Sequence, residues 1–213
     1  MSYIGYVPAA KPLTSADITD GIITSAKIVD GTIVNADINA SAAIASTKLS
    51  GVVSGILQVK KTLITSTIST TVTNTFVDVS GFSVTITPTA SNSQILLLGL
   101  INSSHISDTG QRMRFRLLRG STDITVPDSP GSRQTGFFTP EYDTDDYECT
   151  TGSLTWWDSP ATTSATTYKL QVTTNNSGSQ VAYINRSRTD SDNIDHVRTV
   201  SSIVAIEISN SVL

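Results

Sequence analysis

Large aliphatic residues recur at every fifth position near the start of the chain, and after one extra residue the spacing resumes at Ile44. A period of five matches neither the 3.6-residue repeat of an α-helix nor the two-residue repeat of a β-strand. A longer unit of ten residues lies on the same segment, where Asp20-Gly21 is followed by Asp30-Gly31. We therefore predict a fibrous segment whose core positions are Leu13, Ile18, Ile23, Ile28, Ile33, Ile38, Ile44 and Leu49.

Two arrangements could bury these side chains. In the first, one chain coils on itself as a quadrilateral β-helix, like the pentapeptide-repeat proteins that the unit Ala-Asp-Ile-Thr-Asp resembles. Eight pentads would give only two coils, whereas stacks of this kind usually need three or more repeats. In the second, three chains wrap around a common axis that rings of isoleucine fill. Because its partners come from other chains, the second arrangement suits a short segment, and we expect a trimerisation shaft over residues 13–50.

Composition argues for β structure in the rest of the chain and against nucleic acid as a partner. Charged residues make up 15% of the 213 residues, and short runs of Thr, Val and Ile recur, as strands prefer. The net charge is −4, without the broad basic patch of a nucleic-acid binder. In the densest basic stretch, alternation puts Arg112, Arg114 and Arg116 on one face of a strand, which we expect to face solvent or an interface.

Signals for export, membrane insertion and disulfide formation are weak. The first eight residues lack a charged region followed by an apolar one, so we expect no signal peptide. The apolar run Ile95–Ile101 is far shorter than the ~20 residues of a membrane span and is expected to be a fully buried central strand. Cys149 is the only cysteine, which excludes a disulfide within one chain, and we expect its thiol to be inert.

Residues 1–12 have no regular period. They combine prolines, which favour extended backbone, with four large side chains. One interpretation is a frayed terminus. The other is a segment that docks to a larger assembly through Tyr3, Ile4, Tyr6 and Val7.

After a glycine-bracketed linker over residues 51–55, the sequence reads as a run of short strands over residues 56–213. Alternation of apolar and polar residues predicts strands within 56–65, 76–79, 82–86, 94–101, 112–119, 135–138, 153–157, 168–172, 180–185 and 202–208. Ser80-Gly81 and Asn175–Gly178 are predicted turns. Turn signals roughly every ten residues are typical of an antiparallel β-sandwich, so the fold class is expected to be mainly β.

The chain resembles tail-fibre-like and other virion appendage proteins of bacteriophages, especially marine ones. The segments that carry this resemblance include Ser15–Ile23 and Ala42–Leu49 in the repeat, and Arg119–Thr122, Asp158–Thr163 and Ser201–Ile208 in the strand region. The resemblance implies a homotrimer with a fibrous shaft and a jelly-roll-like head. It does not fix where on the particle the trimer sits.

Two acidic stretches and one aromatic pair are the candidate contact sites. Residues 141–148 contain Asp143, Asp145 and Asp146, and a second stretch contains Asp190 and Asp192. Each is interpreted as a solvated loop, with a cation site or receptor contact as the alternatives; the spacing is not that of a calcium loop. Neighbours on a strand point to opposite faces, so one of Trp156 and Trp157 should enter the core and the other should face solvent, a glycan or a neighbouring subunit.

These observations predict a structural virion protein. We expect a homotrimeric fibre that docks to other virion proteins through its N-terminus and whose head contacts a host-surface glycan or protein. It would be assembled in the host cytoplasm, with no catalytic residues, no cofactor and no membrane insertion. A capsid decoration or head-fibre protein is the first alternative. A surface-glycan depolymerase is the second, since paired carboxylates can cleave glycosidic bonds.

Overall fold

The computed structural model describes residues 14–39, 41–44, 55–104, 112–128, 131–140 and 146–210. The chain divides into two units, Met1–Val52 and Val53–Leu213. The protein is mainly β, and every strand pair in its two sheets is antiparallel. Within the described ranges, no helix has the length and apolar character needed to cross a bilayer.

In the first unit the sequence repeat becomes a repeat of tight turns. Short 3₁₀ turns form at Ser15–Asp17 (η1), Ser25–Lys27 (η2) and Asn35–Asp37 (η3), ten residues apart. Between them the chain reverses at Gly21 and Gly31, whose φ angles of 78° and 79° are adopted freely only by glycine. The described part of the repeat therefore turns about once every five residues, which is why neither a helix nor a strand period appears in its sequence.

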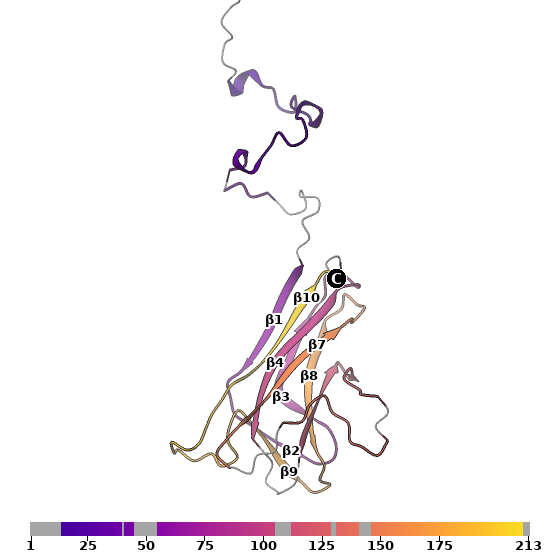
Figure 1. Ribbon diagram of the computed structural model, residues 1–213, viewed down its shortest axis with the longest axis vertical. Helices are drawn as coiled ribbons and strands as arrows, with labels where there is room; N and C mark the ends of the chain where they lie inside the picture. The colour runs from indigo at the N-terminus through magenta and orange to yellow at the C-terminus, as the bar shows by residue number, and fades with distance from the viewer. Residues whose placement is uncertain are drawn as a thin grey trace, which may run out of the picture. The chain divides into compact units, whose positions relative to one another are not determined.

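The first sheet of the second unit has six strands (Figure 1). Its path is β1-β10-β4-β9-β2, and β7 pairs with the other edge of β4. Strand β4 is central because β10 and β9 lie along one of its edges and β7 along the other. The strands are β1 (Ile56–Ile64), β2 (Ile68–Val72), β4 (Gln94–Ser104), β7 (Thr150–Asp158), β9 (Gln180–Ile184) and β10 (Ser201–Ile208).

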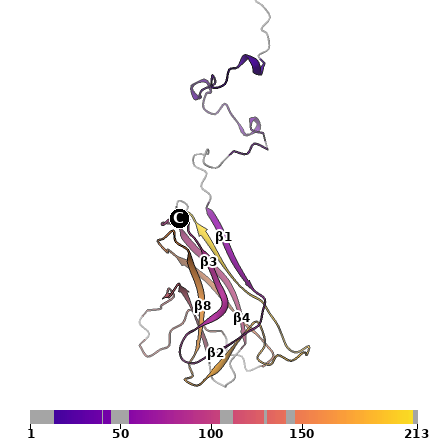
Figure 2. The same ribbon diagram turned by 180° about the vertical axis from the view of Figure 1, so that it is seen from behind.

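The second sheet has four strands in the order β3-β8-β5-β6. Figure 2 shows β3 and β8 side by side, as their register requires. The strands are β3 (Val77–Ile86), β5 (Met113–Arg119), β6 (Thr122–Asp123) and β8 (Thr166–Thr174).

One hydrophobic core lies between the two sheets. Alternate residues of β4 and β10, such as Leu97 and Ile203, meet Phe82, Phe115 and Leu170 from the second sheet. All five side chains are fully buried. Period-two alternation thus places one face of each sheet in the core, as the sequence predicted for a mainly β fold.

Four local expectations were wrong. The strand predicted within 135–138 does not form, and Phe138 makes only an isolated bridge to Phe115. The predicted turn at Ser80-Gly81 is a bulge inside the continuous strand β3, where the pairing with β8 shifts register and Gly81 takes a φ of 72°. The run Ile95–Ile101 is central in its sheet but buried on only one face, because Leu100 on the opposite face is 47% exposed. Arg114 does not face solvent: it is 8% exposed, and its Nη2 donates to the carbonyl of Thr174 at 3.0 Å.

Candidate functional site

The isoleucines of the repeat are exposed in the chain taken by itself. The six core positions from Ile18 to Ile44 have exposed fractions of 39–55%. A chain coiled on itself as a β-helix would enclose these side chains, so the described residues do not form the first arrangement considered for the repeat. Leu13 and Leu49 lie outside the described residues, and the three-chain shaft stays a prediction.

A second apolar surface covers the outer face of the first sheet. Direct cross-strand partners share a face, so the register arranges the outward side chains in rows. One row runs Val59, Ile206, Leu96 and Trp157 across β1, β10, β4 and β7. The next two rows contain Val204 with Leu98, and Leu63 with Leu100. With Ile56 and its partner Ile208, we call this surface the apolar face: Ile56, Val59, Leu63, Leu96, Leu98, Leu100, Trp157, Val204, Ile206 and Ile208.

The apolar face is open to water in the single chain. Five of its side chains are 47–62% exposed, namely Ile56, Val59, Leu63, Leu100 and Trp157. Sequence reasoning singled out only Trp157 from this set. The signal that could have found the rest is the run Ile95–Ile101, which is apolar on both faces and therefore predicts cover on both faces of its sheet.

The aromatic pair divides between the two faces of β7, as strand alternation predicts. Trp156 packs against the core and meets the ring of Phe137 edge-on, with 5.6 Å between ring centroids. Trp157 lies on the apolar face. Phe138 closes the core beside β7, stacked on Phe115 at 5.0 Å and covering Gly152 so closely that a Cβ there would lie 2.2 Å from its ring. An interface role for Trp157 stays a prediction.

The outer face of the second sheet carries paired charges. Lys169 Nζ lies 2.7 Å from Asp78 Oδ2, and Gln171 Nε2 donates to Asp78 Oδ1 at 2.7 Å. Arg116 donates to Gln171, pairs with Asp123 at 3.5 Å and lies over the ring of Phe76. The hydrogen bond from Lys169, more than any other contact, lowers the pKa of the Asp78 carboxyl. We call this surface the charged face: Asp78, Arg116, Asp123, Lys169 and Gln171.

Two buried carboxylates on β7 and β10 lie in the inward row of the first sheet. Asp158 accepts from Arg119 Nη1 at 2.8 Å and from the Tyr168 hydroxyl at 2.6 Å, which ties the first sheet to the second. Burial and the neighbouring Asp158 raise the pKa of Tyr168, so its hydroxyl stays protonated. Burial raises the pKa of Glu207, but hydrogen bonds from Gln58 and Thr89 lower it by more, leaving it below its ordinary value.

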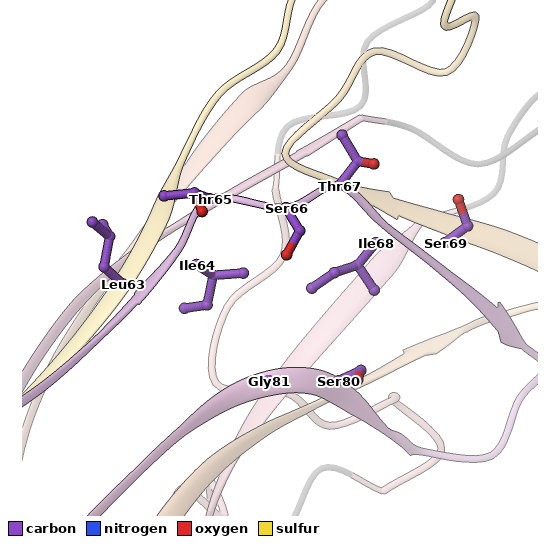
Figure 3. Close-up of a pocket in the computed structure, with 9 residues that line it drawn as sticks. All are labelled: Leu63, Ile64, Thr65, Ser66, Thr67, Ile68, Ser69, Ser80 and Gly81. Carbon is purple, nitrogen blue, oxygen red and sulfur yellow. The ribbon is translucent and has the colours of Figure 1, made fainter.

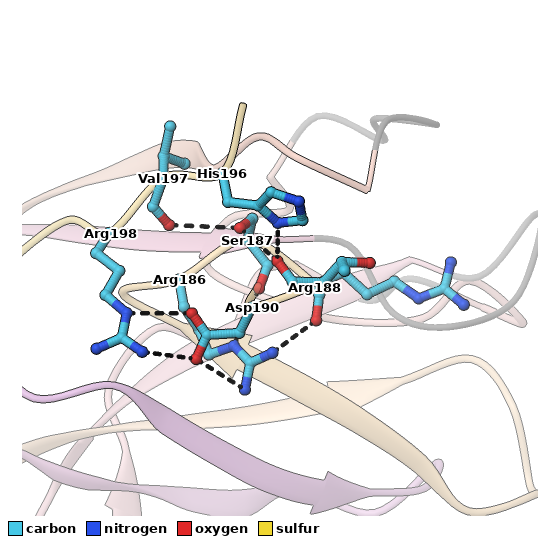
Figure 4. A network of polar contacts seen from close by, with 8 residues as sticks. Arg186, Ser187, Arg188, Asp190, His196, Val197 and Arg198 are labelled. Carbon is cyan, nitrogen blue, oxygen red and sulfur yellow. Dashed lines mark hydrogen bonds and ion pairs between the residues drawn. The ribbon is translucent and has the colours of Figure 1, made fainter. Parts of the chain in front are cut away.

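The loop between β9 and β10 is held by ion pairs (Figure 4). Asp190 accepts from Arg198 Nε at 3.1 Å and Nη2 at 2.9 Å, and Arg186 Nη1 lies 3.6 Å away. The contact with Arg198 lowers the pKa of Asp190. Because guanidinium groups occupy this carboxylate, Asp190 is not a free cation ligand. Asp192 is exposed, and no cluster of His, Cys, Asp and Glu suited to a metal ion occurs among the described residues.

Asn185 anchors this loop to the sheet. It is fully buried in the left-handed region, with a φ of 60°. Its side-chain Nδ2 donates to the carbonyls of Ile64 and Ser66, and its Oδ1 accepts from Ser201 Oγ at 2.6 Å. One residue therefore fixes both the bend between β1 and β2 and the return of the chain into β10.

The bend between β1 and β2 borders an open hollow of about 510 Å³. Figure 3 shows Thr65, Ser66 and Thr67 at the bend, with Ser80 and Gly81 of the β3 bulge across from them. The lining has hydroxyl groups but no ionisable side chain. It has neither a nucleophile with a base nor a set of metal ligands, so its geometry does not by itself define a reaction.

The acidic stretch before β7 is described only in part. Asp146 accepts from Arg188 Nη1 at 2.7 Å, and its carbonyl accepts from the backbone of Thr189, so it belongs to the same loop network. Asp143 and Asp145 lie outside the described residues, as do Tyr3, Ile4, Tyr6 and Val7. Burial raises the pKa of the Cys149 thiol, which keeps it protonated at neutral pH and poorly nucleophilic.

No family model matches the chain, and no curated protein matches it significantly.

Proposed function

We propose that this protein is a structural component of a bacteriophage virion, a homotrimeric fibre whose head projects outward for attachment to the host surface. The repeat segment would join the three chains, and the N-terminal residues would dock to other virion proteins. The resemblance of the repeat and strand segments to virion appendage proteins supports the viral assignment.

The observation that carries the proposal is the exposure of the repeat isoleucines. A half-exposed isoleucine stands to gain about 1 kcal/mol when it is buried, so burial of six per chain favours association. In a three-chain shaft each level of the repeat would place three such side chains on the axis. The turns at Gly21 and Gly31 recur every ten residues, so successive levels would repeat the same contacts.

The strand order supports a jelly-roll-like head. Successive segments of the chain alternate between the two sheets: β1 and β2 in the first, β3 in the second, β4 in the first, β5 and β6 in the second, then β7, β8 and finally β9 and β10. This alternation is how jelly rolls close two sheets over one core. It is a scaffold that leaves long loops free for contact with a ligand.

The loop between β9 and β10 is the described loop best suited to host contact. Its base is fixed by Arg186, Asp190 and Arg198, and Ile194 at its tip is 97% exposed. A rigid loop that presents an apolar side chain loses little entropy on binding. Three copies in a trimer would raise avidity by ~10²–10⁴ without a strong single contact.

Light scattering on the full chain tests the trimer. The wild-type chain should have three times the chain mass, and Ile28→Asp with Ile33→Asp should reduce it. Val29→Asp is the matched control, because Val29 is more exposed than Ile28 but lies outside the five-residue register. A monomeric wild type at micromolar concentration would refute the proposal.

Antibody labelling of phage particles in electron micrographs tests where on the particle this protein lies. Label on tail appendages together with loss of host adsorption after Ile194→Asp would support an attachment fibre. Label spread over the capsid, with adsorption unchanged, would replace it with a decoration protein. Release of sugar from host envelope material by the purified chain would point to a depolymerase instead.

A further inference from the structure

We propose that the apolar face is the surface through which the heads of neighbouring copies contact one another, so that the protein associates through its head as well as through its repeat. This inference rests on the homotrimer proposed above and names a second interface within it.

The size of the apolar face suits a stable interface. Its ten side chains include five that are about half-exposed and five that are partly exposed. The register joins them into one continuous apolar surface over four strands, whereas apolar residues on an ordinary surface are scattered singly, and large continuous patches mark interaction sites.

Charge separates this face from the opposite one. Lys61 is the only ionisable residue in the three rows that cross the first sheet, and it lies on the edge strand β1, where its ammonium group can reach water. The charged face instead carries two acidic and two basic groups that are already paired with one another. A sheet that exposes one face to water normally alternates polar and apolar residues, whereas the central strands β4 and β10 of the first sheet carry apolar residues on both faces.

A second copy of this chain is the partner that best fits the apolar face. The repeat isoleucines and the apolar face both need cover, and copies of the same chain cover both at once. The apolar face also mixes large and small side chains. Beside Leu98 and Leu100, residues Ser153 and Ser202 leave a groove of about 330 Å³ that can receive a side chain from a neighbour. Rotation of three copies about one axis closes such head-to-tail contacts into a ring.

The test uses the full chain carrying Trp156→Phe, which leaves Trp157 as the only tryptophan. Acrylamide quenching then reports whether Trp157 is covered, while light scattering reports the mass of the same sample. In this background Trp157 should be protected. Adding Leu100→Asp should raise its quenching constant several-fold, because Leu100 lies in a different row and affects Trp157 only through the interface. Thr85→Asp on the exposed outer face of β3 is the matched control and should leave Trp157 protected.

The outcomes separate this inference from the proposed function. A trimer in which Trp157 is quenched as readily as in the dissociated single chain, where it is 47% exposed, overturns the head interface and leaves the repeat-mediated trimer standing. A full chain that is monomeric in solution overturns both the head interface and the repeat-mediated trimer. If circular dichroism shows that Leu100→Asp does not fold, Leu63→Asp on the edge strand β1 gives the same test. A trimer in which Leu63→Asp leaves Trp157 protected overturns the inference.

Discussion

The outer faces of the two sheets in the second unit differ in chemistry, although the sheets themselves are built alike. The charged face has Asp78 bonded to Lys169 and Gln171, so its polar groups pair within one chain. The apolar face has Val59 and Trp157 exposed at opposite ends of one row, with Ile206 and Leu96 between them. Both faces are built on antiparallel strands whose side chains point alternately into the core and outward. Strand pairing decides which side chains share a face. The chemistry of those side chains decides whether the face is stable in water or needs cover by protein.

The largest effect is expected where the two sheets are joined. Asp158→Ala leaves the buried Tyr168 hydroxyl and the Arg119 guanidinium without their shared partner. It should lower the free energy of unfolding by about 3 kcal/mol, as the loss of a buried, charge-assisted partner does. Urea unfolding monitored by circular dichroism measures this. A loss below about 1 kcal/mol would show that the two sheets do not depend on this contact.

A substitution on the apolar face should weaken association between chains and leave the folding of the single chain unchanged. Trp157→Ala removes the largest exposed side chain of that face, and truncation of an aromatic that anchors an interface costs about 2 kcal/mol of binding, which is roughly 30-fold in the dissociation constant. Analytical ultracentrifugation across a concentration series measures this change. At concentrations where the wild type and the variant are both monomeric, the unfolding midpoint should be the same. A lower midpoint for the variant would mean that Trp157 stabilises the single chain.

A smaller effect should appear in acid, at the inward-facing Glu207. Because its pKa is below the ordinary 4.5, the unfolded chain binds the proton more readily than the folded one, and the stabilisation is present above pH 4.5 and lost as the pH falls through the folded pKa. Glu207→Gln should therefore flatten the dependence of stability on pH below 4.5. Thermal melts between pH 3 and 7 measure the slopes. Parallel slopes in the two proteins would contradict the assignment.

The smallest effect is expected on the charged face. Asp78→Ala removes an exposed ion pair with Lys169, and such pairs contribute about 0–1 kcal/mol. The unfolding midpoint should move slightly, less in high salt than in low salt because salt screens exposed charges. The mass in solution should stay that of the wild type. Loss of association here would place an interface on the charged face and so reverse the comparison.

Much of the strand pattern follows from sequence because it is local. Alternation in Tyr168–Val172 and Ser202–Ile208 placed β8 and β10 correctly, and the alternation within Trp156-Trp157 separated an inward from an outward ring. Strands β2 and β6 were missed, and the β3 bulge was taken for a turn. A bulge is defined by the pairing with a neighbouring strand, and the sequence of one strand does not show which residues it pairs with.

The sequence by itself determined that the larger part of this protein is antiparallel β and that the first part repeats every five and ten residues, because both properties arise from the spacing of neighbouring side chains. Only the tertiary structure decided that Arg114 is buried and that Asp190 is held by Arg186 and Arg198. It also decided that the outward rows of β1, β10, β4 and β7 merge into one apolar face. These contacts join residues far apart along the chain, and their partners are set by how the sheets assemble.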